Sequence, residues 1–228
     1  MIEPPYYSDD FCSIFLGDSR EIVPELAGEF AVIVSDPPYG ISMATNSKER
    51  GRDGGNSLAV CNDFPPIFGD DEPFDPAWLL ALGVPSVLFG ANHYADKLPP
   101  SPSWWVWDKL DGLESDRDMG FNNNSDVELM WTNLGGPARL LRQRWMGAMK
   151  SGREASHRRV HPTQKPVELM TRILSSVPEG VVLDPYMGSG TTLRAAKDLG
   201  RKAIGIEISE AYAEVAVKRL AQGVLDFG

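Results

Sequence analysis

The sequence has few of the residues from which disulfide frameworks and metal sites are built. Two cysteines, Cys12 and Cys61, occur among 228 residues, neither belongs to a C-x-x-C pair, and the three histidines are scattered. We therefore expect two reduced thiols and no metal. No stretch approaches the roughly 18 apolar residues of a membrane helix, and the first residues lack the basic and apolar regions of a signal peptide. These absences predict a cytoplasmic protein.

Basic residues are also few, because 22 Lys and Arg stand against 32 Asp and Glu, for a net charge of −10. The average hides one basic segment, residues 139–165, with a net charge of +7, which leaves −17 on the rest. Such a concentration suits a local contact with a polyanion, and a solvated charged loop is the alternative. The length suits a single domain, residues 1–228, that carries an insertion.

Strand and helix patterns alternate along the chain and predict an α/β fold with a doubly wound, mostly parallel sheet. Short apolar runs predict strands at residues 12–16, 31–35, 86–90, 104–108, 126–132, 181–183 and 202–206. Helical spacing and capping residues predict helices at 19–26 with Ser19 as N-cap, 75–82, 91–98, 166–177 with Pro166 in the first turn, 191–199, and from the cap Ser209 to 220. Residues 41–72 and the stretch from 133 to about 161 are expected to be irregular.

The most informative stretch runs from residue 181 to residue 207 and reads VVLDPYMGSGTTLRAAKDLGRKAIGIE. A strand ends in Asp184, a turn with Gly188 and Gly190 opens a helix, and a second strand ends in Glu207. This is the arrangement of nucleotide binding at the carboxyl ends of strands. The second acid stands where a carboxylate accepts hydrogen bonds from ribose hydroxyls.

Two phosphate-binding alternatives fit this stretch poorly. A P-loop needs Lys after its last glycine, where Thr191 stands, and a dinucleotide fingerprint needs a third glycine, where Leu193 stands. Asp184 would also repel a pyrophosphate. A cofactor with a ribose and a cationic aminoacyl tail fits better, which favours S-adenosylmethionine.

A second motif, Asp36-Pro37-Pro38-Tyr39, follows the apolar run at 31–35. The two prolines can continue neither a helix nor the hydrogen-bonded pairing of a sheet, so the segment is rigid and extended. The lone pair of an amine on a heteroaromatic ring is delocalised, so the amine is a poor nucleophile. Two acceptors that bind its two N–H groups would favour a pyramidal nitrogen and expose the lone pair to a sulfonium methyl. The Asp36 carboxylate would stabilise the developing positive charge, and Tyr39 could stack on a base outside the helix. The motif therefore predicts methylation of an exocyclic amine.

Together these motifs resemble the N6-adenine and N4-cytosine DNA amino-methyltransferases, in the circularly permuted motif order called the β class. The tetrapeptide comes early and Asp184–Thr192 comes late. His161–Pro166 (HPTQKP) resembles the segment that precedes the cofactor motif in that class, and Gly17-Asp18 resembles the family's early contact to the cofactor adenine. Tyr186 stands where the family usually has Phe, and Asp36, rather than Ser, leans toward adenine.

The resemblance implies a Rossmann-like S-adenosylmethionine-dependent methyltransferase fold and a bacterial or phage-type, DNA-associated enzyme of restriction–modification type, with a homodimer allowed. The expected catalytic residues are Asp36, Pro37, Pro38 and Tyr39. The expected cofactor residues are Gly17, Asp18, Gln164, Lys165, Asp184, Tyr186, Gly188, Ser189, Gly190, Thr191 and Glu207. The expected DNA contacts are Arg142, Arg144, Arg158 and Arg159. An inserted target-recognition segment is expected at residues 109–160, which is short for reading a long site.

Several alternatives remain beside N6-adenine methylation. Cytosine-N4 methylation uses the same chemistry, and a non-catalytic DNA-binding protein could keep the cofactor fold. Cytosine-C5 methylation is rejected, because it needs a cysteine nucleophile after proline, whereas Cys12 follows Phe11 and Cys61 follows Val60. Methylation of RNA or of a protein glutamine uses a tetrapeptide that usually begins with Asn, and Asp36 argues against it.

Overall fold

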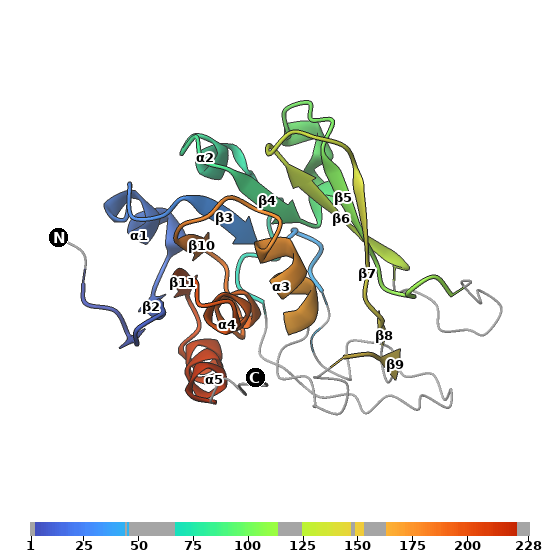
Figure 1. Ribbon diagram of the computed structural model, residues 1–228. Coiled ribbons are helices and arrows are strands. Elements are labelled where there is room, and N and C mark those ends of the chain that lie inside the picture. The colour runs from blue at the N-terminus through green and yellow to red at the C-terminus, as the bar shows by residue number, and fades with distance from the viewer. Residues whose placement is uncertain are drawn as a thin grey trace.

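A computed structural model of the chain describes residues 3–43, 45, 67–113, 125–146, 149–152 and 163–222. Its core is a nine-stranded sheet in the order β1-β2-β11-β10-β3-β4-β6-β5-β7 (Figure 1). The strands are β1 (Tyr7–Ser8), β2 (Cys12–Leu16), β3 (Val32–Ser35), β4 (Ser86–Phe89), β5 (Trp104–Asp108), β6 (Val127–Thr132), β7 (Arg139–Arg142), β10 (Val182–Asp184) and β11 (Ala203–Glu207). A separate pair is formed by β8 (Trp145–Met146) and β9 (Met149–Lys150).

Five adjacent strands, β2, β11, β10, β3 and β4, are parallel. Beyond them, β6 runs antiparallel to β4 and β5, and β7 is parallel to β5. The sheet is therefore mostly parallel, with antiparallel additions on one side. This is the mostly parallel sheet that the alternating strand and helix patterns predicted, and that prediction is confirmed.

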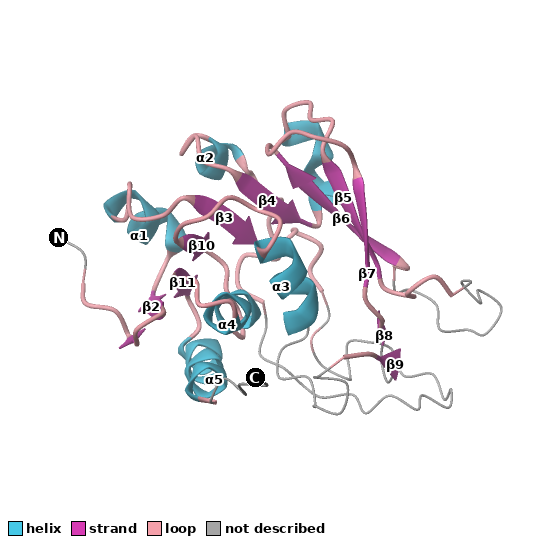
Figure 2. Cartoon of the chain, viewed as in Figure 1, coloured by secondary structure: helices cyan, strands magenta, loops and turns pink. Residues whose placement is uncertain are grey.

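Helices cover both faces of the sheet (Figure 2). They are α1 (Ser19–Glu25), α2 (Ala77–Leu80), the 3-10 helix η1 (Ala91–Lys97), α3 (Val167–Leu174), α4 (Thr191–Asp198) and α5 (Glu210–Ala221). The core therefore consists of two apolar clusters, one on each face of the sheet, and strand β3 contributes to both. Val32 and Val34 pack with α3, α4 and α5, whereas Ile33 packs with α1, α2 and η1. All three side chains are fully buried, which explains the uninterrupted apolar run in the sequence.

Several expectations need correction. The α1 cap is Asp18, not Ser19, because the Asp18 Oδ1 atom accepts from the Arg20 N–H at 2.8 Å. Pro166 is the N-cap of α3 and lies one residue before the first turn. The stretch after β6 was expected to be irregular, but it contains β7, β8 and β9. Strand β7 has only four residues and forms an edge, so its sequence, RLLR, lacks the apolar run of a buried strand.

The tryptophan-rich strand β5 belongs to the core. Trp105 and Trp107 are buried, and the Trp107 indole donates to the Gln143 carbonyl at 2.9 Å. Cys12 is buried as well, which raises the pKa of its thiol to about 12, whereas Cys61 lies outside the described residues. None of the described helices has the length and apolar character required to cross a membrane.

Candidate active site

The sheet brings the separated motifs to one edge. Asp18 follows β2, Glu207 ends β11, Asp184 ends β10, and Asp36 follows β3, and these four strands are adjacent and parallel. The register aligns Val182 with Val32, so the ends of β10 and β3 lie side by side. Carboxyl ends of parallel strands point the same way, so four acidic side chains from distant parts of the sequence converge.

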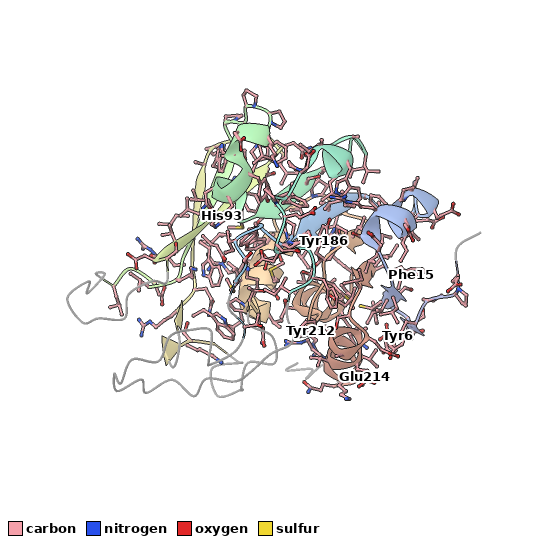
Figure 3. All side chains as sticks on the ribbon, turned by 180° about the vertical axis from the view of Figure 1, so that it is seen from behind. Tyr6, Phe15, His93, Tyr186, Tyr212 and Glu214 are labelled. Carbon is pink, nitrogen blue, oxygen red and sulfur yellow. The ribbon has the colours of Figure 1, made fainter. Side chains whose placement is uncertain are left out.

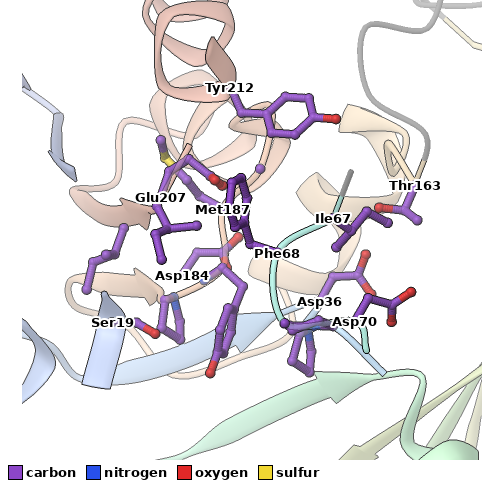
Figure 4. Close-up of a pocket in the computed structure, with 18 of the residues that line it drawn as sticks. Ser19, Asp36, Ile67, Phe68, Asp70, Thr163, Asp184, Met187, Glu207 and Tyr212 are labelled. Carbon is purple, nitrogen blue, oxygen red and sulfur yellow. The ribbon is translucent and has the colours of Figure 1, made fainter. Parts of the chain in front are cut away.

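A cavity of about 380 Å³ lies at this edge (Figure 4). Its size is within the roughly 300–1,000 Å³ of small-molecule sites. Most of the predicted site residues line it: Gly17, Asp18, Asp36, Pro37, Pro38, Tyr39, Gln164, Lys165, Asp184, Tyr186, Gly188, Ser189, Thr191 and Glu207. Gly190 does not. Its backbone is left-handed at φ 74°, and an added Cβ would lie 2.7 Å from the Cβ of Ala216, so close packing of α4 on α5 requires the glycine.

Two buried carboxylates form one end of the cavity. Asp184 accepts from the Ser35 hydroxyl at 2.7 Å, and burial raises its pKa to about 6. Glu207 accepts from the Ser209 N–H at 2.8 Å, and burial raises its pKa to about 7. Neither forms an ion pair with any residue that the structure describes. Such acceptors favour a ligand that supplies hydroxyl or ammonium donors.

The other end of the cavity holds the Asp36–Tyr39 tetrapeptide. The Tyr39 hydroxyl donates to Asp36, and the Tyr39 ring stacks on the His93 imidazole with centroids 4.9 Å apart and planes 11° apart. Gly90 makes room for this ring, because an added Cβ would lie 2.0 Å from it. Figure 3 labels His93 on η1 and Tyr212 on α5, and the two side chains lie apart in this view.

A further carboxylate, Asp70, fixes the backbone that follows the tetrapeptide. Asp70 is 5% exposed, and its two oxygens accept from the backbone N–H groups of four residues. The distances are 3.0 Å to Tyr39, 3.0 Å to Gly40, 3.3 Å to Ile41 and 2.7 Å to Met43. No sequence pattern indicates this role, because Asp70 lies in a polar stretch that looks like an ordinary loop.

Lys165 joins the tetrapeptide to the sheet. Its ammonium donates to Asp36 and lies 3.5 Å from Glu128 Oε1 on β6. Burial alone lowers the pKa of Lys165, but the charges of Asp36 and Glu128 outweigh it and hold the pKa above its usual value. Burial raises the pKa of Asp36, and the Lys165 charge opposes that rise. Lysine and aspartate thus stabilise each other's charged form.

Comparison with known proteins identifies the family. A family model described as a DNA methylase (N6_N4_Mtase) matches residues 89–218, which is more than half of the chain. The chain belongs to this family. M.ScaI, a type II methyltransferase of Streptomyces caespitosus, is 27% identical over 254 residues, which cover 95% of this chain and 83% of that protein.

Solved structures support the same fold. The M1.HpyAVI–SAM complex matches with a TM-score of 0.54 and 24% identity over 92% of this chain and 99% of that one. PvuII DNA methyltransferase (cytosine-N4-specific) matches with a TM-score of 0.59 and 16% identity over 97% of this chain and 90% of that one. These likenesses confirm the predicted Rossmann-like methyltransferase fold.

The methylase cavity also has walls that the sequence did not indicate. Phe68, 59% exposed, Ile67 and Met43 come from the loop that Asp70 holds, and Tyr212 and Ile208 come from the chain after Glu207. The predicted DNA contacts lie elsewhere. Arg142 and Arg144 do not line the cavity, and Arg158 and Arg159 lie outside the described residues. The described residues contain no cluster suited to a metal ion.

Replacing Asp70 by alanine should lower methylase activity at least tenfold and the free energy of unfolding by about 2–3 kcal/mol, because buried N–H groups lose a charged acceptor. Asparagine at this position keeps one acceptor oxygen and should recover part of both losses. Thermal unfolding and kcat measure the effects. Asp96→Ala, which removes an exposed carboxylate from η1, is the control. Wild-type activity and stability in Asp70→Ala would show that the loop is fixed by other contacts.

Proposed function

We propose that this methylase transfers a methyl group from S-adenosylmethionine to the exocyclic N6 atom of an adenine that has been flipped out of duplex DNA. The observation that carries the proposal is one cavity that has two buried carboxylates, Asp184 and Glu207, at one end and Asp36–Tyr39 at the other. A methyl donor and an amine acceptor held at these ends would meet between them.

The carboxylate end suits the cofactor. Glu207 would accept from the ribose hydroxyls, Asp184 would face the cationic aminoacyl part, and Asp18 would lie near the adenine. The raised pKa values of Asp184 and Glu207 support this assignment, because hydrogen-bond donors from a ligand would relieve the cost of burying both charges. When bound, the cofactor supplies an electrophilic methyl group.

The tetrapeptide end suits the amine. Asp36 would accept one N–H of the target amino group, and a backbone carbonyl of the proline pair would accept the other. The carboxylate then stabilises positive charge as the nitrogen gains the methyl group and the methyl–sulfur bond breaks. The aminium would release one proton to solvent, and S-adenosylhomocysteine would be the second product. Tyr39 lines the cavity at this end and would stack on the flipped base. The tetrapeptide precedes the cofactor motif in the chain, which supports the permuted β-class assignment.

Adenine is preferred over cytosine because the tetrapeptide begins with Asp36. Cytosine-N4 methylation is the second candidate, since adenine N6 and cytosine N4 are both amines beside an unprotonated ring nitrogen. PvuII methyltransferase is described as cytosine-N4-specific, but its 16% identity carries the fold alone. The two candidates share every step except the base that enters the pocket.

The identity of the product nucleoside tests the function. Mixed-sequence duplex DNA is incubated with protein and methyl-labelled cofactor, digested to nucleosides and analysed by mass spectrometry. Label in N6-methyladenine supports the proposal. Label in N4-methylcytosine alone would replace adenine by cytosine and keep the mechanism. No label in DNA under conditions where the cofactor binds would favour a non-catalytic DNA-binding protein.

The segment 109–160 is proposed to recognise the target within a single methyltransferase domain. Part of it is built into the sheet, because β7 extends the main sheet beside β5. Arg142 on this edge strand is 59% exposed and lies 3.5 Å from Asp108. The Nε atom of Arg144 is buried with no hydrogen-bond partner among the described residues. The exposed side chain of Arg142 suits contacts with DNA phosphates or base edges, whereas the buried Nε atom of Arg144 does not.

Combined replacement of Arg142, Arg144, Arg158 and Arg159 by alanine should weaken DNA binding and flatten its salt dependence. Each lost phosphate contact lowers the slope of log affinity against log salt by about 0.9. Fluorescence anisotropy over a salt series measures the slope. Replacing Lys202 and Lys218, which lie outside the basic segment, serves as the control. An unchanged slope in the quadruple variant would mean that the segment is a solvated loop.

A further inference from the structure

The charges beside the tetrapeptide form a chain from the cavity into the sheet. Lys165, 5% exposed, lines the cavity, donates to Asp36 and lies 3.5 Å from Glu128 Oε1. Its ammonium also lies 5.2 Å from the centroid of the Phe89 ring. Glu128 does not line the cavity. The lysine therefore faces the ligand space with one carboxylate beside it and a second one behind it.

Glu128 has acceptor capacity to spare. It belongs to β6, which is paired on both sides by β4 and β5, so its backbone is fixed. Its Oε2 atom is buried and has no hydrogen-bond partner within the described parts of the chain. Two carboxylates around one ammonium leave a net charge of −1. The second carboxylate matters because Lys165 keeps a partner even if Asp36 turns away, and a buried charge that loses its partner is strongly unfavourable.

The pairing of Asp36 with Lys165 has the donor and acceptor pattern of a base edge. In adenine the amino group donates and the adjacent ring nitrogen N1 accepts, and in cytosine N4 and N3 do the same. Guanine and thymine present a carbonyl oxygen beside a ring N–H, which is the reverse. An acceptor and a donor that are hydrogen-bonded neighbours can face the amino group and ring nitrogen together.

We propose that Lys165 donates a hydrogen bond to the ring nitrogen beside the target amino group, and that Glu128 is the positioning residue that holds Lys165 there when Asp36 turns to the amine. The inference rests on the proposed function and adds a means of base selection. Together, Asp36 and Lys165 accept adenine or cytosine and reject guanine and thymine. Glu128 keeps the ammonium paired throughout and leaves the site with the negative charge that the developing aminium requires.

The test replaces the ring nitrogen. At an adenine that wild-type protein methylates, a duplex carries 1-deazaadenine, in which C–H replaces N1. Wild-type single-turnover methylation should slow by about 10- to 100-fold, the effect of losing a hydrogen bond to a charged donor. Lys165→Met should be slowed by a similar factor on adenine and should lose nothing further on 1-deazaadenine. The base analogue unpairs more easily than adenine, which could raise its rate of methylation. This effect is the same for wild type and variant, because both proteins are tested on the same two duplexes.

Two further variants define the roles. Glu128→Gln removes the charge behind the lysine and should shrink the wild-type preference for adenine over 1-deazaadenine. Lys197→Met is the matched control, because Lys197 pairs with Asp9 at 2.6 Å outside the cavity, and it should keep the full preference. Calorimetry should show cofactor affinity within about threefold of wild type in Lys165→Met, which also reports that the variant is folded.

The outcomes are distinct. A Lys165→Met protein that still prefers adenine over 1-deazaadenine as strongly as wild type would overturn the base-reading role. Loss of cofactor affinity with that preference intact would assign Lys165 to the cofactor instead. An unchanged preference in Glu128→Gln would remove the positioning role of Glu128. Failure of the proposed function looks different, because wild-type protein would then methylate no amine in DNA. If the product is N4-methylcytosine, 3-deazacytosine is the equivalent probe.

Discussion

Replacing Asp36 by alanine should lower kcat by about a thousandfold while cofactor affinity stays within a few fold. The carboxylate is the group best placed to accept from the target amine and to stabilise its developing charge, and loss of one such interaction costs on the order of 10²–10³ in rate. Cofactor affinity should persist because Asp184 and Glu207 lie at the other end of the cavity. Single-turnover methyl transfer and calorimetry measure the two quantities separately.

Asp9→Ala is the control for this experiment, because it removes a carboxylate that is paired with Lys197 outside the cavity. Its rate should match that of wild type. In Asp36→Ala the ammonium of Lys165 still has Glu128 3.5 Å away, so the pocket keeps a balanced pair. A folded Asp36→Ala protein with near-normal kcat would remove the tetrapeptide carboxylate from the chemistry.

Replacing Glu207 by alanine should weaken cofactor binding by about 1–3 kcal/mol, roughly a 5- to 150-fold rise in Kd, because charge-assisted hydrogen bonds are lost. Affinity in the wild type should also depend on pH. The pKa of Glu207 in the free protein is raised to about 7, and ligand hydroxyls favour the ionised form. Affinity should therefore rise by up to about tenfold per pH unit below pH 7 and level off above it. Asp184, with a pKa of about 6, adds to the rise below pH 6.

Glu207→Gln provides the control for folding. A carboxyl group whose folded pKa is raised contributes stability below its unfolded pKa of 4.5 and loses that contribution as the pH rises through about 7. The glutamine variant of the cofactor-free protein should accordingly have a higher Tm than wild type at pH 8 and a similar Tm near pH 4. A stabilised variant that binds cofactor as tightly as wild type would exclude Glu207 from the cofactor site.

The buried strands and the cofactor motif were predictable because their signals are local. Strands β2 and β5 match the predicted boundaries, and the acid–glycine–acid pattern marks β10, α4 and β11. Residues that act through distant neighbours were not predictable. Asp70 binds backbone about 30 residues earlier, and Glu128 meets Lys165 only after β6 joins the sheet. Edge strand β7 was missed because most of its side chains are exposed, so its sequence contains no long apolar run.

Gly190 shows how a motif residue can have a different physical reason from the expected one. Gly190 was expected to be a cofactor residue, whereas an added Cβ at this position would meet Ala216 of α5. The family resemblance assigned Lys165 to the cofactor site. In the structure, its ion-pair partners among the described residues are Asp36 and Glu128. Sequence motifs identified the right neighbourhood, while the direction of each side chain depended on packing between elements.

The order of strands in the sheet also determines when this protein can fold during its synthesis. Strands β10 and β11, orange and red in Figure 1, lie between β2 and β3, which are blue. A ribosome that has made residues 1–150 has therefore produced β2 and β3 without the two strands that separate them. The apolar β3 then has an unpaired edge, which is prone to aggregation. The central sheet can close only after β11 leaves the exit tunnel, so the facing edges of β2 and β3 stay unpaired until then.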